Sequence, residues 1–114
     1  MIVIYQKPTC TTCRAVHAAL KESGVDFTAV DYYVDPIPKD KLLQLLKKMK
    51  MRPADLLRTT EPIYKTLDIR NRHLTDDQIV DLMVQHPDLI QRPIVEKGSK
   101  AILARPAERL KEIL

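Results

Sequence analysis

Two cysteines three positions apart, Cys10 and Cys13, stand where an apolar strand pattern gives way to a helical one. Residues 1–5 form the apolar run Met-Ile-Val-Ile-Tyr, and the residues after the cysteines carry apolar side chains at helical spacing. At a strand-to-helix turn, free backbone N–H groups and the positive end of the helix dipole favour a thiolate on the first cysteine. The second thiol lies one turn further on, close enough to attack any bond that the first one makes. The pair is therefore a candidate redox centre, or half of a metal site.

The composition predicts one domain with an ordinary core and no structural disulfides. The chain has 114 residues, of which 45% are hydrophobic and 30% charged. Both cysteines belong to the C-x-x-C motif, which leaves none for a disulfide framework and indicates a reducing compartment. The apolar start is five residues long and has no basic residues beside it, so it predicts neither a signal peptide nor a membrane span. We expect a cytoplasmic monomer, since no apolar stripe is evident outside the expected core faces.

Neither nucleic-acid binding nor a metal site is indicated by the remaining residues. The net charge is +4, but the only dense basic run, at 47–52, lies at the end of an amphipathic segment, and a chain with one Phe and no Trp offers no base-stacking platform. A structural zinc site needs four ligands, and a second C-x-x-C is absent. His17 lies four residues after Cys13, while His73 and His86 show no ligand spacing. We expect no bound metal.

The periodicity of apolar residues predicts an α/β fold. Strands are expected at 2–5, 27–33, 94–96 and 101–103, and helices at 14–22, 42–49, 54–57, 63–67 and from 75 to 86. Gly24 ends the first helix, and Pro106 fits the first turn of a last helix whose Leu110, Ile113 and Leu114 face inward. The order βαβ, several helices, then ββα is that of a thioredoxin-like (glutaredoxin-like) mixed sheet flanked by helices. We predict one domain over 1–114, with a helical insertion at about 38–87.

Four segments of the chain resemble the ArsC/Spx family of thioredoxin-fold proteins, in the order that the family has them. They are residues 5–14 (YQKPTCTTCR), 54–58 (ADLLR), 86–95 (HPDLIQRPIV) and 104–106 (ARP). Any one of these motifs is weak evidence, whereas four in order are specific and cover the whole chain. The resemblance implies a thioredoxin-like fold with the helical insertion described above.

The resemblance to the glutaredoxin-coupled arsenate reductases of this family implies a site around Cys10. In those enzymes three arginines surround the nucleophilic cysteine, and the matching positions here are Arg58, Arg92 and Arg105. Planar guanidinium groups suit tetrahedral oxyanions better than lysines do. Cys10 would attack arsenate, a second thiol would attack the adduct, and arsenite would leave. The peptide before Pro93 resembles the cis-proline that faces the active cysteine in thioredoxin folds.

Two positions depart from the arsenate reductase pattern. Those enzymes usually place a His where this chain has Gln6, which can orient a ligand but supplies no charge. They generally lack a cysteine at the position of Cys13, which the Spx branch has. The resolving thiol could therefore be internal, and a Cys10–Cys13 disulfide would then be reduced by thioredoxin or glutaredoxin without a glutathione adduct. Arg14 follows the family pattern and adds positive potential beside the pair.

Two functions follow from the resemblance. The first is a thiol-dependent oxidoreductase that reduces arsenate to arsenite, without a bound cofactor, and takes electrons from glutathione, glutaredoxin or thioredoxin. The second is an Spx-like transcriptional regulator, in which the cysteine pair is a redox switch and the domain binds the RNA polymerase α subunit. The C-x-x-C motif favours the regulator. The complete set of arginines, and the lack of the longer Spx tail after Leu114, favour the enzyme, which we take as the first hypothesis.

Overall fold

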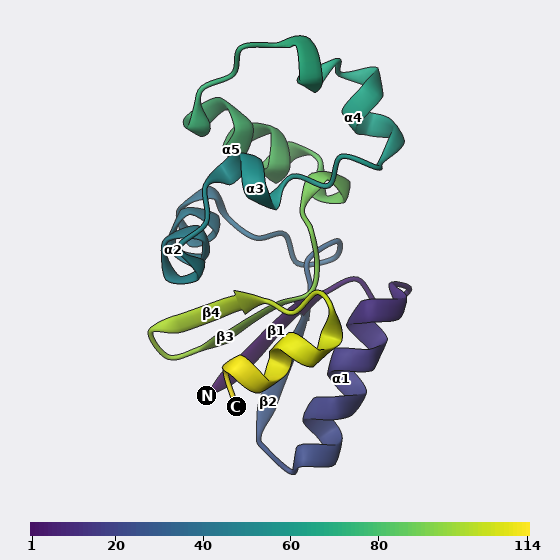
Figure 1. The fold of residues 1–114 in the computed structure, drawn as a ribbon, viewed down its shortest axis with the longest axis vertical. Helices are drawn as coiled ribbons and strands as arrows, with labels where there is room; N and C mark the ends of the chain where they lie inside the picture. Colours follow the sequence, from purple (N-terminus) through teal and green to yellow (C-terminus); the bar gives the residue numbers. More distant parts are fainter. The chain divides into compact units, whose positions relative to one another are not determined.

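The computed structural model describes residues 1–114 and divides the chain into two compact units (Figure 1). The first unit consists of residues 1–36 and 92–114, and the second consists of residues 37–91. The second unit therefore interrupts the first in sequence. No helix in either unit is long and apolar enough to cross a membrane.

The first unit is built on a four-stranded mixed sheet (Figure 1). Its strands lie in the order β2-β1-β3-β4, with bounds β1 (Ile2–Gln6), β2 (Phe27–Asp31), β3 (Ile94–Lys97) and β4 (Lys100–Leu103). Strand β1 pairs in parallel with β2 and antiparallel with β3, and β3 pairs antiparallel with β4. The parallel pair needs a crossover, which α1 (Thr11–Ser23) provides. The β3–β4 pair closes through a two-residue turn in which Gly98 has a φ of 60°.

Helix α1 and the final 3-10 helix, η3 (Ala107–Glu112), pack together and bury one apolar core against the sheet. The core residues are Ile2, Ile4, Val16, Leu20, Val95, Ala104, Leu110 and Ile113. Ile2 and Ile4 are two apart on β1 and so point to the same face, whereas Val16 and Leu20 are four apart on α1. Gly24 ends the helix in the left-handed conformation, with its N–H bonded to the carbonyl of Lys21, as its position in the sequence predicts.

The second unit consists of short helices that bury apolar side chains between them, among them Leu42, Leu56 and Val80, and that carry caps and ion pairs nearer the surface. In chain order they are α2 (Lys39–Met49), α3 (Pro53–Leu56), α4 (Pro62–Thr66), η1 (Ile69–Asn71), α5 (Asp76–Gln85) and η2 (Pro87–Leu89). Helix α5 starts at a reciprocal cap, because the Thr75 hydroxyl accepts from the Gln78 N–H at 3.2 Å and the Gln78 side chain accepts from the Thr75 N–H at 2.9 Å. Lys39 joins α2 to α5 through Asp77 and Asp81, each with an oxygen 2.9 Å from its Nζ.

The expected fold class is confirmed, with two local corrections. Strand β2 ends at Asp31 and not at residue 33, because the Asp31 carboxylate accepts from the Tyr33 N–H at 3.0 Å and turns the chain. The last helix is a 3-10 helix that has Pro106 as its N-cap and not in its first turn. Its three-residue turn places Leu110 and Ile113 on one side, so Leu114 does not face inward and stays 49% exposed.

Substitution of Leu20 tests this packing. Leu20 is fully buried on α1, so Leu20→Ala should lower the free energy of unfolding by about 2–5 kcal/mol through lost burial and a cavity. The matched change Leu114→Ala should cost less than about 0.5 kcal/mol, because that side chain is already exposed. Urea denaturation followed by circular dichroism measures both. A similar loss in the two variants would contradict the placement of the C-terminus.

Candidate active site

Cys10 is the N-cap residue of α1, in an extended conformation with φ −80° and ψ 128°. Its N–H donates to the carbonyl of Lys7 at 2.9 Å, which closes the loop after β1, and its carbonyl accepts the first helical hydrogen bond, from Arg14, at 3.0 Å. This position places the thiol at the positive end of the helix. Cys13 follows in the first turn and is fully buried, whereas Cys10 is half-buried, and both are free thiols.

The pKa values of the two thiols are shifted in opposite directions. Burial opposes ionisation of Cys10, but hydrogen bonds from the backbone N–H and the thiol of Cys13, and from the Arg92 guanidinium, together outweigh it and lower the pKa of Cys10 to about 7. Burial raises the pKa of Cys13 to about 12, and the neighbouring Cys10 charge adds to that rise. Near neutral pH, Cys10 is therefore substantially a thiolate and Cys13 is its protonated hydrogen-bond donor.

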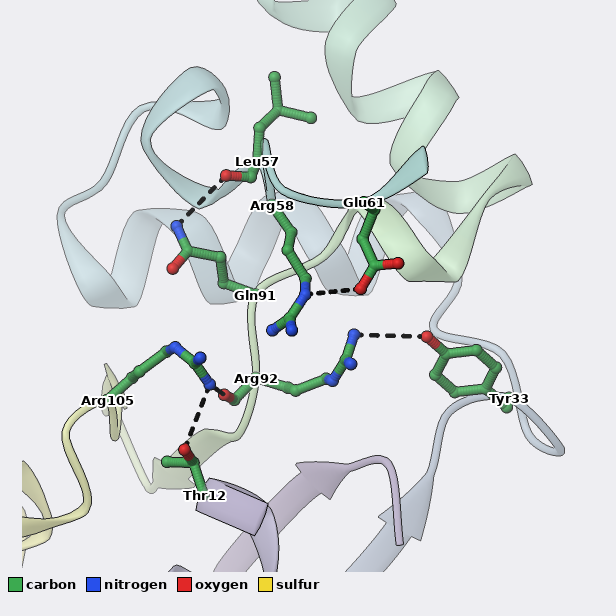
Figure 2. A network of polar contacts seen from close by, with 8 residues as sticks. All are labelled: Thr12, Tyr33, Leu57, Arg58, Glu61, Gln91, Arg92 and Arg105. Atoms are coloured by element: carbon green, nitrogen blue, oxygen red, sulfur yellow. Dashed lines mark hydrogen bonds and ion pairs between the residues drawn. The ribbon is translucent and has the colours of Figure 1, made fainter. Parts of the chain in front are cut away.

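Arg92 supplies the buried positive charge of this site. It is only 5% exposed and precedes Pro93 through a cis peptide bond, as the family resemblance implies. Its Nη1 donates to the Tyr33 hydroxyl at 3.5 Å (Figure 2). Burial opposes its charge, but Tyr32, Tyr33 and Cys10 act in the other direction and keep the pKa of Arg92 above its usual value. Arg92 therefore remains a cation beside the Cys10 sulfur.

Tyr33 is also a member of the site, although the sequence pattern predicts only that it belongs to a strand at 27–33. Its ring lies under the Lys7 ammonium, with 4.8 Å from Nζ to the ring centroid, and beside the Tyr32 ring at a centroid distance of 5.0 Å. These contacts fix the hydroxyl that faces Arg92. The turn at Asp31 brings Tyr33 here, and apolar periodicity carries no signal for it.

Arg105 reaches the same helix end from the segment after β4. Its Nη1 donates to the Thr12 hydroxyl at 3.3 Å and to the Arg92 carbonyl at 3.4 Å (Figure 2). The peptide between Arg105 and Pro106 is also cis, which the sequence pattern does not predict. The first unit therefore brings four of the expected site residues together: Cys10, Cys13, Arg92 and Arg105.

Arg58, the third expected arginine, belongs to the second unit. Its backbone N–H donates to the Leu89 carbonyl at 2.7 Å, and its Nε pairs with a Glu61 oxygen at 2.7 Å (Figure 2). The neighbouring strand-like contact between Leu57 and Ile90 anchors this segment within the unit. Glu61, which orients the guanidinium, was not identified from the sequence, because nothing local distinguishes it from a surface acid.

Gln6 and Arg14 precede and follow the Cys10 loop in sequence, at the end of β1 and near the start of α1. Gln6 ends β1 and is 9% exposed, and its Oε1 has no hydrogen-bond partner. Arg14 is exposed and its Nε donates to the Pro8 carbonyl at 3.1 Å. His17 contacts the Phe27 ring edge-on, with centroids 5.2 Å apart. No group of three or more His, Cys, Asp or Glu side chains comes together to form a metal site.

Comparison with known proteins gives consistent matches over almost the whole chain. Residues 5–113 match the sequence model of the ArsC family. An arsenate reductase from Escherichia coli is 38% identical over 113 residues, which are 99% of this chain and 80% of that protein. One from Acidiphilium multivorum is 37% identical with the same coverage. The solved structure of an arsenate reductase from Vibrio cholerae superimposes with a TM-score of 0.94 at 32% identity, covering 99% of this chain and 97% of that one.

The thiolate is open to a direct test by alkylation with iodoacetamide. The alkylation rate of Cys10 should rise with pH around a midpoint of about 7. Arg92→Gln removes a neighbouring cation, so the midpoint should move upward, toward the value of about 8.5 for a free cysteine, and the rate at pH 7 should fall several-fold. The control Arg70→Gln makes the same change at an exposed position of the second unit. An unchanged midpoint in Arg92→Gln would contradict the contact.

Tyr33 should act on the same titration through Arg92. Tyr33→Phe keeps the ring against Lys7 and Tyr32 but removes the hydroxyl that accepts from Arg92. We expect the Cys10 midpoint to rise and the alkylation rate at pH 7 to fall about twofold, with a larger fall for Tyr33→Leu, which also removes the ring. If both variants titrate like the unmutated protein, Tyr33 does not position Arg92.

Proposed function

Because this chain belongs to the ArsC family, we propose that it is an arsenate reductase, a thiol-dependent oxidoreductase that converts arsenate to arsenite. One observation carries the proposal: a half-buried cysteine at a helix N-terminus is ionised near neutral pH by hydrogen bonds from Cys13 and the buried Arg92. That is the chemistry of an activated thiol nucleophile. The Spx-like regulator is not favoured, because the relatives that match nearly the whole chain are named arsenate reductases.

In this proposal the arginines bind the substrate. Arsenate near neutral pH is a tetrahedral oxyanion with up to two negative charges, and a thiolate alone would repel it. Arg92 and Arg105, which meet at the N-terminus of α1, offer two planar guanidinium groups to its oxygens. Arg58 would supply a third, oriented by its ion pair with Glu61. Fixed cations beside the nucleophile offset the repulsion and stabilise the charge of the adduct.

The reaction then proceeds in two displacements. The Cys10 thiolate attacks arsenic, a sulfur–arsenic bond forms, and one oxygen leaves as water after taking up protons. A second thiolate next attacks the Cys10 sulfur, so that a sulfur–sulfur bond forms and the sulfur–arsenic bond breaks. The electron pair of the broken bond stays on arsenic, which leaves as arsenite. Two thiols are thereby oxidised to a disulfide while arsenic(V) is reduced to arsenic(III), and no metal is required.

Cys13 is the proposed second thiol. It lies in the turn that Cys10 begins and donates a hydrogen bond to the Cys10 sulfur. The Cys10 charge contributes to the high pKa of Cys13. Once Cys10 is bonded to arsenic that charge is lost, so Cys13 becomes easier to deprotonate at the stage where it is needed as the attacking group. Thioredoxin or glutaredoxin would then reduce the Cys10–Cys13 disulfide, whereas an external glutathione would bypass Cys13.

Turnover assays with two electron donors test this mechanism. Arsenite production is measured with glutathione and glutaredoxin, and separately with thioredoxin, thioredoxin reductase and NADPH. We expect Cys10→Ser to abolish turnover with both donors, because no thiolate remains to attack arsenate. Cys13→Ser should lose the thioredoxin-driven rate and keep a rate with glutathione. Circular dichroism of both variants controls for folding.

The outcomes separate the steps of the proposal. No turnover by the unmutated protein with either donor would overturn arsenate as the substrate. A Cys13→Ser variant with an undiminished thioredoxin-driven rate would overturn the internal disulfide but leave Cys10 as the nucleophile. Residual turnover in Cys10→Ser comparable with that of the unmutated protein would overturn the role of Cys10.

A further inference from the structure

The cysteine pair has a second chemical capability, because two thiols in contact can bind one soft atom together. Cys10 is the N-cap of α1 and Cys13 is the third residue of that helix, so their side chains are neighbours on its first turn. The Cys13 thiol donates a hydrogen bond to the Cys10 sulfur. A soft atom bonds to thiolate sulfur at about 2.3 Å in zinc sites. At bonds of that length, one atom can reach both of two sulfurs that lie in hydrogen-bond contact.

The pair supplies two ligands and is joined by no third. No group of three or more His, Cys, Asp or Glu side chains comes together anywhere in the structure. A structural zinc ion takes four protein ligands, so this pair does not satisfy it. Trivalent arsenic and antimony form only three bonds, and two sulfurs with one hydroxide complete them. The number of ligands therefore suits a trivalent metalloid better than a metal ion.

The charge around the pair selects in the same direction. The buried Arg92 guanidinium donates a hydrogen bond to the Cys10 sulfur, and Arg105 lies next to it, 3.4 Å from Nη1 to the Arg92 carbonyl. Cations at this distance repel a divalent metal ion. Arsenite and antimonite near neutral pH are uncharged hydroxides, which the arginines do not repel. Their remaining hydroxyl oxygen can accept a hydrogen bond from Arg92.

Arsenic reaches the buried Cys13 only by way of Cys10. Cys10 is half-buried and the pKa of its thiol is about 7, so it forms the first sulfur–arsenic bond and displaces a hydroxide, which takes up a proton from solvent. The tethered arsenic then meets Cys13 at a high effective concentration. The Cys13 thiol displaces a second hydroxide, which leaves as water with the thiol proton. Arsenic stays trivalent throughout, and no electrons are transferred.

We propose that the reduced Cys10–Cys13 pair chelates uncharged hydroxides of trivalent metalloids, such as arsenite and antimonite. Each forms two sulfur bonds and keeps one hydroxide, which faces Arg92. This binding goes beyond the proposed reduction of arsenate and does not depend on it, because it needs neither arsenate nor an electron donor.

Protection of Cys10 from alkylation measures this binding. The full-length protein is reduced with a phosphine, which leaves no competing dithiol, and is treated with iodoacetamide at pH 7 over a series of arsenite or antimonite concentrations. We expect both compounds to slow alkylation saturably. Mass spectrometry of the arsenite complex should show one arsenic per chain and the loss of two waters. Absence of saturable protection, or a complex that has lost only one water, would overturn the chelate.

Variants of Cys13 test the second sulfur. Cys13→Ala and Cys13→Ser keep the Cys10 thiol, and each should bind arsenite at least about a hundredfold more weakly than the unmutated protein. Thr11→Ser changes an exposed residue of the same helical turn and should leave binding unchanged. Each protected rate is compared with the same variant's rate without arsenite, and circular dichroism controls for folding. Unchanged arsenite affinity in either folded Cys13 variant would show binding by Cys10 alone and overturn the proposal.

Zinc tests the selection by charge. Zinc at the arsenite concentration that gives full protection should leave the alkylation rate of the unmutated protein nearly unchanged. Arg92→Gln removes the nearest cation, so protection by zinc should rise at least about threefold relative to protection by arsenite. Zinc that protects the unmutated protein as well as arsenite does would overturn the preference for uncharged hydroxides.

Discussion

The contact between the Arg92 guanidinium and the Cys10 sulfur is the interaction on which the proposed chemistry depends. It exists because β1 and β3 are antiparallel neighbours, with Tyr5 opposite Ile94. Cys10 follows the end of β1 and Arg92 precedes the start of β3. Because the two strands are antiparallel, both segments lie at the same end of the strands. The pairing of two strands that are some 90 residues apart in sequence therefore places a cation beside a thiol.

The two cysteines show what that contact achieves. They lie in one helical turn, yet the pKa of Cys10 is lowered and that of Cys13 is raised. Burial acts on both in the same direction, since it disfavours a thiolate. Only Cys10 receives hydrogen bonds from Arg92 and from its partner cysteine, and these outweigh its burial. The proposed nucleophile and the proposed resolving thiol are the same residue type, and they differ in how deeply they are buried and in the hydrogen bonds that they receive.

Helices and strands form the core, whereas the segments that connect them carry the charged residues of the site. Regular elements provide the core, where Ile4, Leu20 and Val95 are fully buried. The charged groups come from the segments between those elements: Arg92 from the approach to β3, and Arg105 from the exit of β4. These segments hold the buried Arg92 and the partly exposed Arg105 in place because the strands behind them are fixed. In the second unit, Arg58 also lies in a connecting segment, and the hydrogen bond from its N–H to the Leu89 carbonyl holds that segment in place.

The sequence by itself determined the fold class, most element positions and the reactive cysteine pair, because apolar period, the Gly24 and Thr75 caps and the C-x-x-C spacing are local signals. Resemblance to a family added the arginines and the cis-proline. Only the tertiary structure revealed the Tyr33 contact with Arg92 and the lack of a hydrogen-bond partner for the buried Gln6 oxygen. The rise in the pKa of Cys13 also required it, whereas the thiolate on Cys10 is predicted from its position before the helix. Burial and through-space contacts decide all of these, and a residue's neighbours along the chain do not encode either one.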